Sequence, residues 1–172
     1  HVLDKSRADL LLSLYGNSSL DYFKTAIDKQ LYFSNLLDGF VSYKVHHPYA
    51  IVLEEPVCSY DDKEGLISEF ENFCYSQGLH AIYYRVSESS LAYFNEFKKR
   101  KIVIGEEAVM EVSKFSLEGK DRKSLRNSLN ALQKKGYEAE VLFAPHSDEI
   151  VESLKQVSDD WLLFYNKKEM VF

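Results

Sequence analysis

Residues 80–86 carry apolar or aromatic side chains at both odd and even positions. Successive side chains of a β-strand point to opposite faces, so Ala81 and Tyr83 fall on one face and Ile82 and Tyr84 on the other. A strand that is apolar on both faces is typical of the interior of a sheet covered on both sides. The segment therefore predicts a central strand, buried in the middle of a sheet.

Hydrophobic periodicity predicts the elements around this strand. A helix between Asp62 and Gly78 precedes the strand, and a short helix begins at Ser87. We also expect helices at 4–14 and 18–27 and strands at 31–33, 40–45, 49–53 and 108–112. This is the order of elements in the GNAT acyltransferase fold without its first strand. The predicted fold class is α+β (mixed α/β), with residues 1–115 as a first GNAT-like domain.

After residue 115 the pattern begins again, with a basic helix, a strand at 139–143 and a helix that starts at Ser147. Three such elements are too few to cover both faces of a sheet. We therefore expect residues 116–172 to be the N-terminal part of a second GNAT-like domain, which is incomplete in this chain.

The net charge of the basic helix is opposite in sign to that of the whole chain. Residues 119–136 hold six basic side chains and one acidic one, a local charge of +5, whereas the whole chain carries −6. A helix places three leucines on one stripe and Arg122 and Arg126 on another face. The reversal indicates a surface that docks an anion, for which phosphate is the obvious candidate. A merely solvated charged face is the alternative that composition leaves open.

Composition and motifs limit the chemistry. With 45% apolar and 14% aromatic residues, the chain has the material for a globular core. Cys58 and Cys74 lack metal-ligand spacing, and we expect reduced thiols. The apolar runs are far shorter than the roughly 20 residues of a membrane-spanning helix. No metal-binding or cofactor-binding motif is present, so we predict neither a metal nor a cofactor.

The sequence does not identify catalytic residues. Segment 55–62, where a coenzyme A acyltransferase would have its glycine-containing pyrophosphate loop, is acidic and lacks glycine. The chain has no nucleophile elbow and no P-loop. His46 and His47 are adjacent, as are Glu106 and Glu107, and neighbouring side chains on a strand diverge. Neither pair predicts a catalytic or metal site.

Several short strings are more specific as a set than any single motif. They lie at 15–23, 28–34, 104–108, 115–120, 125–126 and 157–162. In this order they resemble the C-terminal cytosolic catalytic region of bacterial phosphatidylglycerol lysyltransferases, also called multiple peptide resistance factors. The similarity spans nearly the whole chain, and it implies two fused GNAT-like units.

The resemblance also implies an aminoacyltransferase that moves lysine, or alanine in some relatives, from its tRNA to phosphatidylglycerol. The expected partners are aminoacyl-tRNA (lysyl-tRNA) and phosphatidylglycerol at the membrane surface, and the expected location is the cytoplasmic face of the bacterial cell membrane. The product makes the membrane less anionic, which confers resistance to cationic antimicrobial peptides. The chain alone is expected to be inactive, and its oligomeric state stays open.

The resemblance implies a ligand for the basic helix. Lys120, Arg122, Lys123 and Arg126 would bind phosphates of the tRNA or the phosphate of the lipid. Residues 98–101 depart from the family pattern and add a basic cluster, which would widen the RNA-binding surface or lie in solvent. Two alternatives remain: a Fem-type peptidyltransferase that delivers the amino acid to a cell-wall precursor, and a non-catalytic GNAT-like binding module.

Overall fold

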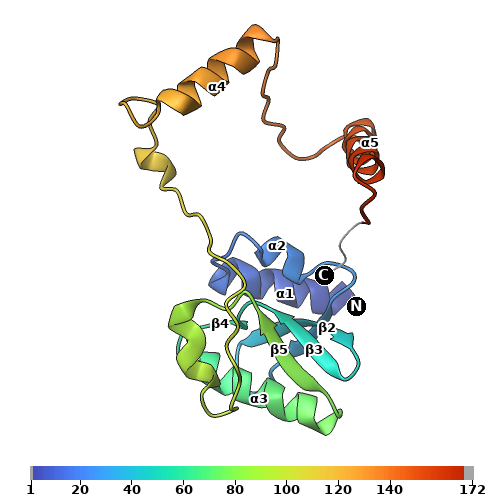
Figure 1. Cartoon of the computed structure of the whole chain (residues 1–172). Coiled ribbons are helices and arrows are strands. Elements are labelled where there is room, and N and C mark those ends of the chain that lie inside the picture. Colours follow the sequence, from blue (N-terminus) through green and yellow to red (C-terminus); the bar gives the residue numbers. More distant parts are fainter. Residues whose placement is uncertain (1, 169–172) are drawn as a thin grey trace. The chain divides into compact units, whose positions relative to one another are not determined.

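The computed structural model describes residues 2–168, with side chains from Asp4 onward. It divides into two compact units, His1–Ile102 (unit 1) and Val103–Phe172 (unit 2), which are described separately. Unit 1 contains both helices and a mixed sheet, so the predicted α+β class is confirmed (Figure 1). That residues 116–172 begin a second GNAT-like domain stays a prediction, and residues 169–172 lie outside the described part.

Unit 1 follows the predicted order of elements as far as η1, with one additional short strand, β4. Its helices are α1 (Val2–Tyr15), α2 (Asp21–Lys24), α3 (Lys63–Ser76) and the 3-10 helix η1 (Glu88–Phe94). Its strands are β1 (Gln30–Phe33), β2 (Gly39–His46), β3 (Tyr49–Leu53), β4 (Val57–Cys58) and β5 (His80–Tyr84). The second helix is shorter than predicted, because its apolar stripe is not a buried face. Ile27 is fully exposed, whereas Lys24 is the buried residue of α2.

The sheet has the strand order β1-β2-β3-β5. The first three strands form the predicted antiparallel meander, and β5 pairs in parallel with β3. The short strand β4 continues the line of β3 and pairs with β2, where Gly39 lies opposite Cys58. Between β3 and β4 the chain turns at Glu54, which has a positive φ of 59°.

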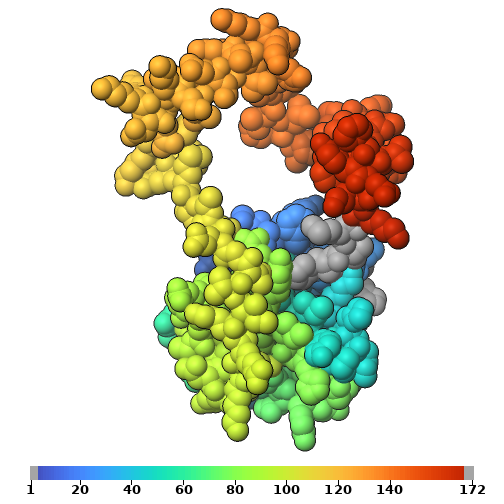
Figure 2. All heavy atoms as spheres, in the orientation of Figure 1, coloured from blue at the N-terminus to red at the C-terminus, as the bar shows by residue number. Residues whose placement is uncertain are grey.

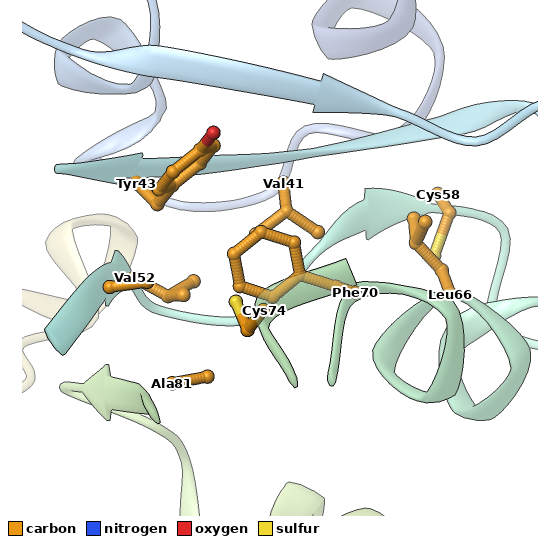
Figure 3. Packing of buried hydrophobic residues seen from close by; sticks show 9 residues of the cluster. Val41, Tyr43, Val52, Cys58, Leu66, Phe70, Cys74 and Ala81 are labelled. Carbon is orange, nitrogen blue, oxygen red and sulfur yellow. The ribbon is translucent and has the colours of Figure 1, made fainter. Parts of the chain in front are cut away.

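Each face of the sheet packs against its own helix. Strand residues that include Val41, Tyr43 and Val52 point at Phe70 and Cys74 of α3 and form the larger core cluster (Figure 3). On the opposite face, Phe40 and Val57 pack with Ala8 and Leu11 of α1. Because side chains alternate along β2, neighbouring residues such as Phe40 and Val41 supply both cores.

The prediction of a central strand at residues 80–86 is wrong. Among the described residues β5 pairs only with β3 and lies at the edge of the sheet. On its open face Ile82 is 45% exposed and Tyr84 is 39% exposed. The predicted next strand, at 108–112, is not a strand in the structure.

Lys99 occupies this edge instead. Its ammonium donates to the carbonyl of Ala81 at 2.8 Å and lies 2.8 Å from a carboxylate oxygen of Glu71 on α3. The segment after η1, in yellow-green, accordingly lies over the part of unit 1 where Figure 1 draws β5 (Figure 2). A charged side chain at a strand edge is a common way to block pairing with another chain.

Unit 2 contains the 3-10 helix η2 (Val112–Lys114) and the helices α4 (Lys123–Lys134) and α5 (Asp148–Phe164). The predicted strand at 139–143, like that at 108–112, does not form. A strand needs a partner for its backbone hydrogen bonds, and the described residues of unit 2 include none. No helix in the described part of the chain has the length and apolar character needed to cross a membrane.

Candidate anion-binding site

The basic helix predicted from the sequence forms α4. Gly136 lies just past its end with φ of 80°, the left-handed conformation that glycine adopts at little cost. Leu125, Leu129 and Leu132 are 40–47% exposed on one face. At the other end, Arg122 is the N-cap residue but makes no side-chain cap hydrogen bond. The backbone N–H groups of the first turn therefore have no side-chain cap.

A hollow of about 630 Å³ runs along the polar face of α4 and opens to solvent. Two of the predicted site residues, Lys120 and Lys123, line it. The other lining residues are Asp121, Ser124, Asn127, Ser128 and Ala131. Helical periodicity places Lys134 on this same side, three residues beyond Ala131. We call this face, from Lys120 to Lys134, the polar strip.

The two predicted arginines do not line the hollow. Arg126 turns toward the loop before the helix, where its guanidinium donates to the carbonyl oxygens of Leu117 and Gly119, the latter at 2.7 Å. The guanidinium of Arg122 lies 5.7 Å from the centroid of the Phe115 ring, in a cation–π contact. The structure thus separates the four cations into two that line the hollow and two that contact the 115–119 loop.

Sequence patterns did not single out the neutral members of the strip. Ser124, Asn127 and Ser128 supply hydroxyl and amide groups between the lysines. Ser124 and Asn127 lie four and seven residues after Lys120, and Ser128 lies four residues after Ser124. This spacing repeats the helical period and is the available signal.

Half of the second basic cluster, at 98–101, is paired within unit 1. Lys99 pairs with Glu71, and the ammonium of Lys101 lies 3.3 Å from a carboxylate oxygen of Glu88. These contacts neutralise two of the four cations. The polar strip is therefore the better candidate for an external anion.

A buried charge cluster in unit 1 is also satisfied internally. Lys24 is 5% exposed, and its ammonium lies 2.9 Å from Asp21 and 3.2 Å from Glu54. The hydroxyl of Ser18 donates to the other oxygen of Glu54 at 2.8 Å. This cluster joins α2 to the end of β3 and leaves no cation free for a ligand.

In segment 55–62 the carboxylate of Glu55 is hydrogen-bonded within unit 1. Glu55 accepts hydrogen bonds from the backbone N–H of Ser87 at 3.0 Å and from the Ser87 hydroxyl at 2.8 Å. Burial by itself raises the pKa of Glu55, but hydrogen bonds from Ser90 and Ser87 outweigh it, so the pKa lies below its usual value. Glu55 thus fastens the start of η1 to the break between β3 and β4.

Neither cysteine forms a disulfide. Burial raises the pKa of both thiols, Cys58 and Cys74, to about 11, which keeps them protonated near neutral pH. Among residues 2–168 no group of three or more histidine, cysteine or acidic side chains is placed to hold a metal ion. The described part of the chain does not assemble a catalytic constellation, and the catalytic residues stay unassigned.

Comparison with known proteins identifies relatives along nearly the entire chain. Residues 10–172 match the family model described as "Phosphatidylglycerol lysyltransferase, C-terminal". The phosphatidylglycerol lysyltransferase of Staphylococcus xylosus is 31% identical over 162 residues, and that of Staphylococcus aureus strain MRSA252 is 28% identical over the same length. These alignments cover 94% of this chain but 19% of each relative, so the chain spans about a fifth of their length.

Solved structures agree with the fold. The structure of L-PGS from Bacillus licheniformis superposes with a TM-score of 0.85 at 28% identity, covering 97% of this chain and 52% of that one. A C-terminal domain from Agrobacterium fabrum superposes with a TM-score of 0.86 at 27% identity, covering 99% of this chain and 54% of that one. These similarities support the predicted GNAT-like acyltransferase fold.

Proposed function

Because the chain belongs to the family of the phosphatidylglycerol lysyltransferase C-terminal region, we propose that it is part of an enzyme that transfers lysine from lysyl-tRNA to phosphatidylglycerol. The match over residues 10–172 carries the proposal. The names of the matched relatives favour a lipid acceptor over the cell-wall precursor of Fem-type enzymes, and an enzyme over a non-catalytic binding module. Alanine remains the second candidate amino acid.

The proposed transfer does not require a nucleophilic side chain. An aminoacyl ester is already activated by its tRNA, so the enzyme must bring the ester carbonyl and a lipid hydroxyl together and stabilise the charge that develops on the carbonyl oxygen. The lysyl group adds two ammonium groups to a lipid with one phosphate charge. The transfer thus changes the lipid from an anion to a cation.

The proposal includes four cations that contribute to the binding of a phosphate-bearing substrate: Lys120, Arg122, Lys123 and Arg126. The +5 segment that contains them is the most basic part of an acidic chain. Since aminoacyl-tRNA is found in the cytoplasm and phosphatidylglycerol in the membrane, the reaction would occur on the cytoplasmic face of the membrane.

The full gene product that carries this chain tests the proposal. Membranes from cells expressing it are incubated with tRNA charged with radioactive lysine and with phosphatidylglycerol vesicles, and lipids are separated by chromatography. We expect the label in a lipid that co-migrates with lysyl-phosphatidylglycerol, and none with phosphatidylcholine vesicles. Label in a cell-wall precursor, or in no lipid while a relative run in parallel is active, would refute the assignment. Alanine-charged tRNA tests the second amino acid.

A further inference from the structure

Resting on this proposed function, we infer that the four cations divide between two roles, with the polar strip contacting the RNA backbone and the two arginines positioning the loop before it. Lys120 and Lys123 are the contact residues. Arg126, supported by Arg122, is a positioning residue. Neither the sequence pattern nor the similarity to relatives makes this division.

The dimensions of the strip favour a polyanion. From Lys123 to Lys134 the helix rises about 16 Å, at 1.5 Å per residue. A nucleic acid carries a phosphate about every 3.4 Å along each strand of a duplex. The strip therefore faces several successive phosphates, with cations at both ends, whereas the single phosphate of one lipid could not reach both.

The lining chemistry points the same way. Between the lysines lie Ser124, Asn127 and Ser128, which donate hydrogen bonds to phosphate and sugar oxygens without selecting a base. Ala131 is the single apolar residue of the hollow, so the strip offers no groove for acyl chains. The exposed leucines lie on a different face of α4.

The comparison of the two long helices of unit 2 supports the assignment. Both α4 and α5 are amphipathic, with exposed apolar stripes. However, α5 has five acidic residues and one basic residue, Lys155. A polyanion would be attracted to α4 and repelled by α5. Lys155 therefore provides a matched control for the loss of one exposed helical lysine.

The arginine contacts define the positioning role. A guanidinium donates in a planar fork, and that of Arg126 reaches two carbonyl groups of one loop, at Leu117 and Gly119. An ammonium has the same charge but not the fork. These bonds fix the backbone immediately before Lys120, and so they determine where its ammonium enters the strip.

Binding of uncharged tRNA to the 172-residue chain, measured by fluorescence anisotropy at several salt concentrations, tests the contact residues. We expect Lys120→Gln and Lys123→Gln each to weaken binding and to lower the slope of log K against log salt by roughly 0.7 to 0.9, the value for one lost phosphate contact. Lys155→Gln should leave the slope unchanged. Equal slopes for all three variants would overturn the inference.

The same chain tests the positioning role through Arg126→Lys. We expect weaker tRNA binding and a lower salt slope, because the displaced Lys120 loses its phosphate contact although the charge at position 126 is kept. We also expect faster amide hydrogen exchange at residues 117–120 and unchanged helical circular dichroism. Full binding by Arg126→Lys would show that only its charge matters and would overturn the role.

Binding of the variants to phosphatidylglycerol vesicles tests whether the strip contacts the lipid phosphate instead of the RNA. If Lys120→Gln and Lys123→Gln weaken vesicle binding but not tRNA binding, the strip serves the lipid and the inference fails, while the proposed transfer reaction stands. If the full gene product makes no lysyl-lipid although the strip binds tRNA, the proposed reaction fails instead.

Discussion

At the scale of single residues, the structure separates side chains that the sequence presents as equivalent. Lys99 and Lys101 are close neighbours in one basic run, yet their surroundings differ. Lys99 is tied to Glu71 and to the Ala81 carbonyl, whereas the pair of Lys101 with Glu88 is exposed. No local pattern shows this difference, because Glu71 is 28 residues away in the chain.

Lys99→Met is expected to destabilise the protein. It leaves the Glu71 carboxylate, whose side chain is 14% exposed, without its cation, and an unsatisfied buried group costs about 1–3 kcal/mol. Lys101→Met removes only an exposed pair and should change stability by less than about 1 kcal/mol. Urea unfolding followed by circular dichroism measures both variants, and equal stabilities would contradict the contacts described for Lys99.

At the scale of elements, close packing explains the position of Gly39. A Cβ atom on Gly39 would lie 2.7 Å from the Cβ of Cys58 and 2.8 Å from the carbonyl oxygen of Val57. Both contacts are with β4, which pairs with β2 at this point. A single methyl group would thus force the two strands apart.

Gly39→Ala should cost about 1–3 kcal/mol of stability, the usual range for overpacking a core. Gly65→Ala is the matched control on α3, where the nearest atom is the flexible end of Leu37 at 3.1 Å and alanine favours the helix by up to about 1 kcal/mol. Thermal unfolding compares the two. A melting temperature for Gly39→Ala at or above that of Gly65→Ala would be inconsistent with the packing.

Elements with strong local signals were predictable, and those that depend on distant partners were not. The periodicity of α3 and α4 and the meander β1-β2-β3 appear in the structure as expected. The segments 108–112 and 139–143 have strand-like composition but no pairing among the described residues. The two-residue strand β4 is defined by its pairing with the distant strand β2. Likewise, helical periodicity does not predict the hydrogen bonds from Arg126 to two loop carbonyls.

At the scale of the whole molecule, paired carboxylates make the stability of the fold depend on pH. Hydrogen bonds from Lys29 and then Lys44 lower the pKa of Asp28 from 3.8 to about 2. A lowered carboxyl pKa contributes stability that is fully present above the unfolded value of 3.8 and is lost as the pH falls through about 2. Because Asp28 lies at the surface, solvent screening limits its contribution to well below about 1 kcal/mol.

Asp28→Asn should therefore be slightly less stable than the parent at pH 6, and the difference should shrink between pH 4 and pH 2, as expected from the two values of 3.8 and about 2. Urea unfolding at pH 6, 4 and 3 measures this trend. A difference that stays constant over these pH values would show that the ion pairs with Lys29 and Lys44 do not contribute.

The ammonium of Lys99 at the open side of β5 also protects the chain from its own copies. A strand of another molecule could pair with β5 at Ala81 only after the Lys99 ammonium had left the Ala81 carbonyl and the Glu71 carboxylate. The charge of Lys99 would thus hinder the assembly of many copies through their β5 edges at high protein concentration. Replacing Lys99 with a neutral residue would leave β5 open as a template for fibre growth.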